Sequence, residues 1–109
     1  MNDSFLLKPY DTLVWAVRHK PTGFWLGGHA HYSNTWCEPY ASNRPRLFFT
    51  KRGAQNSLTA WLQGRQSIEY GTRMDWQGKD DFAKRKIEHV PERKREDMEI
   101  VELQLTEIL

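Results

Sequence analysis

Large apolar residues recur at every second position near the start of the chain, alternating with Val14, Ala16 and Arg18, which is the period of a strand. Within residues 12–19, one face of this strand carries Leu13, Trp15 and Val17. A KPTG turn follows at 20–23, where proline fixes φ and glycine can adopt a positive φ. A second apolar run then covers 24–26. The pattern predicts a β-hairpin over residues 12–27.

Residues 46–64 predict a short strand followed by a helix that carries both of its end signals. The run at 47–49, Leu-Phe-Phe, favours a strand. Thr50 can cap the helix by accepting a hydrogen bond from a first-turn N–H, and Gly64 stands where a C-cap is expected. The apolar residues of the predicted helix fall on one face at helical spacing, and they are Ala54, Leu58, Trp61 and Leu62.

Alternation returns at residues 98–105, where Val101, Leu103 and Leu105 are separated by polar residues. We expect this final strand beside the first hairpin, with the helix covering their shared apolar face. The predicted fold is a single α+β domain over 1–109. It has a small antiparallel sheet of three to four strands, in the order ββ(β)αβ, packed on one main helix.

Two stretches lack a clear period. Residues 28–45 contain several Gly, Asn, Ser and Pro residues, which is typical of a loop excursion. Residues 65–97 are polar and charged, and we interpret them as a connection that is partly disordered. Within this connection, residues 80–89 could form a short helix that ends at Pro91, although its apolar face is thin. The basic triplets 84–86 and 93–95 are typical of solvated surface.

Composition limits the class of protein. Hydrophobic residues make up 39% of the chain and aromatic residues 13%, which predicts a small core built largely from rings. No apolar run reaches the ~20 residues that a membrane span needs, and no signal peptide is recognisable at the start. The single cysteine, Cys37, fits a reducing compartment. We therefore expect a soluble cytoplasmic protein with no membrane partner.

Candidate catalytic and metal chemistry is weak. His29, His31 and Cys37 have ligand types that zinc prefers, with His19 as a fourth, but their spacing lacks the paired ligands of structural zinc sites. A Cys37 nucleophile with a histidine base is chemically possible, and Asp75, Asp80 and Asp81 could hold Mg²⁺. Neither pattern is specific. We expect no catalytic residues, no metal and no cofactor.

Binding is better supported, in two alternative classes. The residues from which we expect binding combine aromatic rings with basic side chains, all within the first 65 residues: Tyr32, Trp36, Tyr40, Arg44, Arg46, Lys51 and Arg52. Such a mixture can neutralise phosphates and stack on bases, which favours a nucleic acid or nucleotide. Tyr, Trp and Arg are also the residues of protein interface hot spots, which favours a protein partner. An open sheet edge, for example at the last strand, would also permit a homodimer.

Three segments together resemble a family. They are VRHKPTGFWL at 17–26, RLFFTKRGAQNSLTAWLQGR at 46–65 and REDMEIVELQL at 95–105. Their combination is similar to a group of small proteins of tailed bacteriophages, to which no activity is assigned. The resemblance implies a phage origin, and with it a place in the cytoplasm of an infected bacterium, but no activity. By analogy with other small phage products that attach to host proteins, we expect a host protein as partner, as in anti-defence or host takeover. The resemblance carries over no functional residue, and the segment 27–45 varies within the group.

Overall fold

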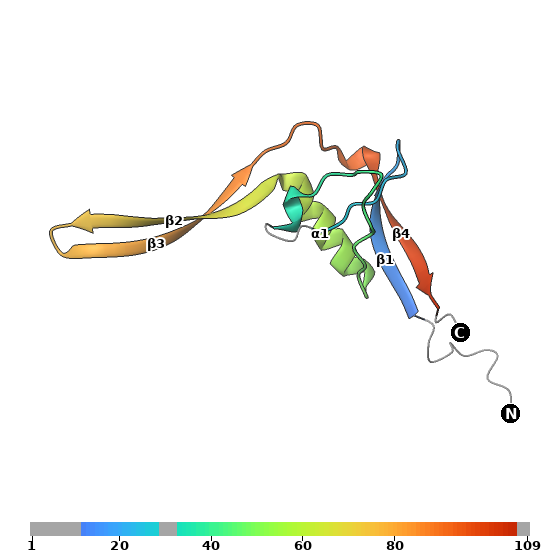
Figure 1. The fold of residues 1–109 in the computed structure, drawn as a ribbon, viewed down its shortest axis with the longest axis horizontal. Coiled ribbons are helices and arrows are strands. Elements are labelled where there is room, and N and C mark those ends of the chain that lie inside the picture. Colours follow the sequence, from blue (N-terminus) through green and yellow to red (C-terminus); the bar gives the residue numbers. More distant parts are fainter. Residues whose placement is uncertain (1–11, 29–32, 107–109) are drawn as a thin grey trace, which may run out of the picture.

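The computed structural model describes residues 12–28 and 33–106, which form a small α+β body and a hairpin projecting from it (Figure 1). This confirms the predicted fold class, although the strands are arranged in two sheets. The body contains β1 (Thr12–His19), η1 (Asn34–Trp36), α1 (Lys51–Gln63), η2 (Arg95–Asp97) and β4 (Met98–Leu105). The projecting hairpin consists of β2 (Arg65–Asp75) and β3 (Gly78–Glu88).

Strand β1 lies at the centre of the body sheet. One of its edges pairs antiparallel with β4 over its whole length, from Thr12 opposite Leu105 to His19 opposite Met98. The prediction that the last strand lies beside the first is therefore confirmed. The body's strands come from the two ends of the described chain, so this sheet closes the fold.

The other edge of β1 is shared by two short segments. Trp15 and Phe48 exchange two backbone hydrogen bonds of 2.8 Å, and the N–H of Leu26 donates to the C=O of Val17 at 2.9 Å. Each predicted strand on this side, 24–26 and 46–49, is thus reduced to one bridge, at Trp25 and at Phe48. The reason is geometric: both segments lie end to end along one edge of a strand only eight residues long.

Helix α1 begins and ends as the sequence predicts. Thr50 Oγ1 accepts a hydrogen bond from the N–H of Gly53 at 3.0 Å, and Gly64 ends the helix with φ of 133°. A Cβ at Gly64 would lie 2.1 Å from the carbonyl oxygen of Glu88, so only glycine lets β3 pass this closely. The helix packs its apolar face on the sheet, and the core cluster contains Val17, Leu26, Cys37, Ala54, Leu58, Trp61 and Met98.

The prediction for residues 65–97 is wrong. This stretch is mostly an antiparallel hairpin of two 11-residue strands, paired from Arg65 opposite Glu88 to Asp75 opposite Gly78. The chain reverses at Trp76–Gln77, and Gly78 has φ of 121°. The predicted short helix over 80–89 is absent, since these residues belong largely to β3. Both faces of the hairpin are largely exposed to solvent, so its strands are polar. This polar composition is the reason why the sequence predicted a partly disordered connection.

We expect Trp61→Ala to lower the free energy of unfolding by about 3–5 kcal/mol, because Trp61 is only 3% exposed and fills the centre of the core. The matched control is Trp76→Ala at the hairpin tip, where the side chain is 90% exposed and the change should cost less than ~0.5 kcal/mol. Urea unfolding followed by circular dichroism measures both. Equal midpoints for the two variants would contradict the position of α1.

Candidate binding surface

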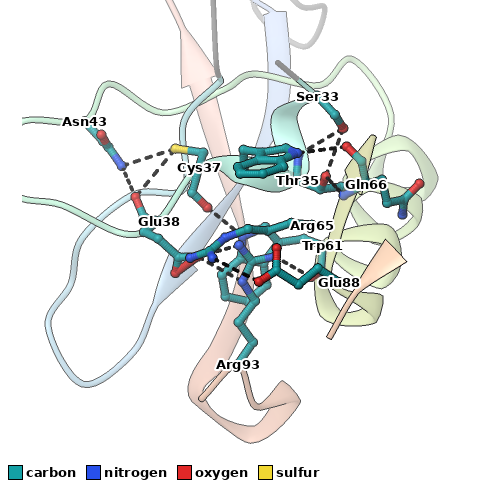
Figure 2. A network of polar contacts seen from close by, with 11 residues as sticks. Ser33, Thr35, Cys37, Glu38, Asn43, Trp61, Arg65, Gln66, Glu88 and Arg93 are labelled. Atoms are coloured by element: carbon teal, nitrogen blue, oxygen red, sulfur yellow. Dashed lines mark hydrogen bonds and ion pairs between the residues drawn. The ribbon is translucent and has the colours of Figure 1, made fainter. Parts of the chain in front are cut away.

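The hairpin is fastened to the body at its first residues (Figure 2). The N–H of Gln66 donates to Thr35 Oγ1 at 2.9 Å, and Trp36 Nε1 donates to the C=O of Gln66 at 2.8 Å. The side-chain amide of Gln66 also donates to the C=O of Ala60 at 3.1 Å. These bonds join η1, the end of α1 and the start of β2. They fix the position of the Trp36 ring relative to the hairpin.

An ion pair with a buried arginine fixes the segment that follows β3. The Arg93 side chain is 1% exposed, and its guanidinium forms an ion pair with Glu38, in which Nε donates to Oε1 at 3.0 Å. Arg93 Nη1 also donates to the C=O of Trp61 at 2.8 Å, and the guanidinium carbon lies 4.3 Å from the centre of the Trp61 ring. The interpretation of 93–95 as solvated surface is therefore wrong for Arg93. Lys94 and Arg95 are exposed.

One face of the hairpin exposes several large apolar side chains among polar ones. Residues that pair across antiparallel strands share a face, which places Ile68 with Arg85, Tyr70 with Ala83, Met74 with Lys79 and Gln66 with Ile87. We call the set Ile68, Tyr70, Met74, Ala83 and Ile87 the apolar face. Its largest members stand in solvent: Ile68 is 59% exposed, Tyr70 76% and Met74 71%. Soluble proteins rarely leave so many large apolar side chains together without a partner for them.

The apolar face is hollowed where it meets the body. A groove of about 700 Å³ lies between η1 and the hairpin, and its lining includes Trp36, Gln66, Ile68, Tyr70, Ala83 and Arg85. We call it the Trp36 groove. Arg85 is the charged residue of this lining, and its guanidinium donates to the side-chain oxygen of Gln66. The groove therefore combines aromatic walls with one cation.

The opposite face of the hairpin has a different character. Its cross-strand pairs include Glu69 with Lys84 and Arg73 with Asp80, both of opposite charge. Its one large apolar side chain, Phe82, lies across Gly71, where a Cβ would come within 2.4 Å of the ring. The Arg73 guanidinium lies 5.7 Å from the centre of the same ring. This face therefore places opposite charges across from each other, whereas the apolar face leaves Ile68, Tyr70 and Met74 in solvent.

The structure separates the binding residues that the sequence predicts. Trp36 lines the groove, next to Gln66 just beyond the end of α1. Lys51 and Arg52 lie in the first turn of the same 13-residue helix, which is ~20 Å long. The aromatic and basic halves of the predicted site are therefore at opposite ends of α1.

The remaining predicted residues do not gather around Trp36 either. Arg44 is exposed, and Tyr40 is 60% exposed beside a separate hollow that Phe24 and Glu92 also line. Arg46 stacks on the Phe48 ring at 4.8 Å, with Nη1 3.4 Å from Ser57 Oγ. Tyr32 lies outside the described residues, as do His29 and His31 of the predicted metal group.

Cys37, the third member of that group, belongs to the core. It is buried, and its thiol lies 3.5 Å from the carbonyl oxygen of Glu38 and 3.6 Å from Asn43 Nδ2. Among the described residues, no three His, Cys, Asp or Glu side chains come together in a way that would hold a metal ion. In the same part of the chain, no helix is both long and apolar enough to cross a membrane.

The comparisons with known proteins place the chain in no family. No protein-family model, curated protein or solved structure matches it. The resemblance to small phage proteins thus rests on the three sequence segments alone.

We expect Glu38→Ala to destabilise the fold by about 3–5 kcal/mol, because it leaves the buried Arg93 charge without its carboxylate. Arg93→Met should also destabilise, and the double variant should cost less than the two single changes added together, by ~0.5–3 kcal/mol. Chemical denaturation of all three variants completes the cycle. Lys94→Met, an exposed neighbour, is the control and should leave stability nearly unchanged. Strict additivity of Glu38→Ala and Arg93→Met would show that the pair is not coupled.

Proposed function

We propose that this chain is a non-enzymatic binding protein that attaches to a host protein through the apolar face of its hairpin and the Trp36 groove. The observation that carries the proposal is the exposure of Ile68, Tyr70 and Met74 on one face of a hairpin whose base is fastened to the body. The phage resemblance supports a bacterial host protein, such as an enzyme or a defence complex, as the partner.

The residues of this surface suit a protein interface. Aromatic residues, Met and Arg are enriched in interfaces, and Trp, Tyr and Arg are the most frequent hot spots. The groove brings one of each together as Trp36, Tyr70 and Arg85. The hydrogen bonds of Gln66 hold Trp36 in place before binding, so less side-chain freedom would be lost on association.

The chemistry of the groove defines the partner further. Its aromatic and aliphatic walls suit an apolar side chain of the partner, while Arg85 would attract a carboxylate beside it. We therefore expect the recognised segment to present an apolar residue next to an Asp or Glu.

Nucleic acid is the alternative class, and the hairpin supports it less. Residues 65–88 carry six basic and five acidic side chains, so the projecting element is nearly neutral. The basic residues Lys51 and Arg52 lie at the far end of α1 from the aromatic groove. The cations beside the groove are Arg85 and Arg65, whose guanidinium lies 5.7 Å from the centre of the Trp36 ring. Two carboxylates, Glu38 at 3.9 Å and Glu88 at 4.0 Å, lie beside Arg65 and reduce the positive charge available to phosphates.

We expect the double variant Ile68→Ser with Tyr70→Ser to lose capture of host protein from a bacterial lysate by more than tenfold, because two central apolar contacts are removed. The bait is the tagged chain, and the lysate is treated with nuclease in one arm. Bands are quantified by mass spectrometry.

The matched control is Glu69→Ser, which lies between the two positions but points to the charged face. It should capture the same proteins as the parent. Equal capture by the double variant and the control would contradict the proposed surface. Loss of all bands on nuclease treatment, together with binding of an oligonucleotide at low salt, would favour nucleic acid instead.

A further inference from the structure

The outer edge of β3 is open to another strand. Gln66 directs its N–H and C=O away from β3, to Thr35 and Trp36, so the cross-strand pairs at alternate positions are not hydrogen-bonded to each other. Their β3 members therefore also direct their backbone groups outward, and they are Lys79, Asp81, Ala83, Arg85 and Ile87. Within residues 12–28 and 33–106, β2 is the only strand that pairs with β3.

This edge belongs to an element that a further strand would stabilise. Every residue of β3 is exposed, and two-stranded hairpins that stand alone in water are marginally stable. An edge with free N–H and C=O groups is also a template for strand addition. Neither observation identifies the added strand, but the charge sequence of β3 does.

We propose that β3 pairs antiparallel with β3 of a second copy of this chain, about a twofold axis at Ala83. In this register Asp80 faces Lys86 of the other copy, and Asp81 faces Arg85. The twofold axis repeats both pairs, which gives four contacts of opposite charge. At the centre, Ala83 of one copy lies opposite Ala83 of the other. Their outward N–H and C=O groups form a hydrogen-bonded pair.

The charges favour this register over its neighbours. A sheet that keeps each side chain on its own face can shift only in steps of two residues. A shift in one direction places Lys79 opposite Arg85 twice, which offsets the two Asp80–Lys84 pairs that the same shift creates. A shift in the other direction places Asp80 opposite Glu88 and Lys84 opposite Lys84. Like charges directly opposite each other destabilise a strand pair. Self-complementarity of this kind favours a second copy over an unrelated strand.

The other candidate edges fit a second copy less well. Strand β4, which we considered from the sequence, contains acidic residues but no basic ones, so its copies cannot form opposite-charge pairs. On β2, Thr35 and Trp36 occupy the edge at Gln66, so a second copy could pair only with the outer part of that strand.

The proposed pairing leaves the binding surface free. Edge pairing covers backbone groups and not the faces of the sheet, so the apolar side chains and the aromatic walls of the Trp36 groove stay open, while Arg85 of the groove also faces Asp81 of the second copy. It also brings the turn at Trp76, whose side chain is almost fully exposed, beside residues 88–92 of the second copy. A hollow of about 450 Å³ lies there, and its lining includes Glu38, Arg65, Glu88, Val90 and Pro91.

Exchange of the charges tests the register. Sedimentation equilibrium of the purified parent should give twice the 12.9 kDa mass of one chain. Asp80→Lys with Asp81→Lys should be monomeric, as should Arg85→Asp with Lys86→Asp, because each places like charges opposite each other. An equimolar mixture of the two variants should recover the dimer mass, since lysines of one then face aspartates of the other.

The chain that carries all four substitutions should also dimerise, and circular dichroism checks that each variant is folded. Glu102→Lys on β4 is the control and should remain dimeric. A monomeric parent at high concentration would overturn the proposal, as would a mixture that stays monomeric or a loss of the dimer in the control. These measurements use no host partner, so their outcome is independent of the proposed function.

Discussion

The ion pair between Arg93 and Glu38 is the interaction on which the arrangement of the two parts depends. Glu38 comes from the segment after η1, Arg93 from the segment after β3, and both meet at the C-terminal end of α1, where Arg93 also bonds to Trp61 (Figure 2). Trp61 in turn donates from Nε1 to the C=O of Cys37 at 2.7 Å. A charge that is buried this completely needs all of its partners, so these three segments must be positioned together.

The contacts among Arg93, Glu38 and Trp61 set the orientation of the hairpin. Its first strand leaves α1 through Gly64, and its second returns to Arg93, so both legs start from residues that these contacts hold. Beyond the base, β3 is exposed along its whole length and contributes no residue to the core cluster. Stability is therefore concentrated in the body, and the outer hairpin is the region where local opening costs least. These exposed strands, which we propose as the binding element, contribute little to the stability of the fold.

The sequence was informative where the structural signal is local. Thr50, Gly64 and the apolar face of α1 lie within one turn or a few turns of each other, and their pattern identifies the helix without knowledge of the rest. The hairpin was missed because solvent on both faces removes the hydrophobic alternation that a strand pattern relies on, although Ile68, Tyr70 and Met74 all occupy even positions. The burial of Arg93 could not be seen at all, since its partner Glu38 lies 55 residues earlier. Likewise, Trp36 was predicted from its residue type, but its neighbours in the groove come from two strands that had no predicted position.

The face and the edge of the hairpin have different chemistry, and this lets two proposed interactions coexist. A twofold axis perpendicular to a sheet keeps each face on its own side, so an edge-paired dimer would present both apolar faces in the same direction. Two grooves on one side of a four-stranded sheet would bind a partner with two equivalent sites far more tightly than one groove does, because the second contact is intramolecular. The wider sheet would also stabilise each hairpin, since its outward backbone groups would then be paired. On this basis, self-association would strengthen partner binding while the aromatic walls of the groove stay unchanged.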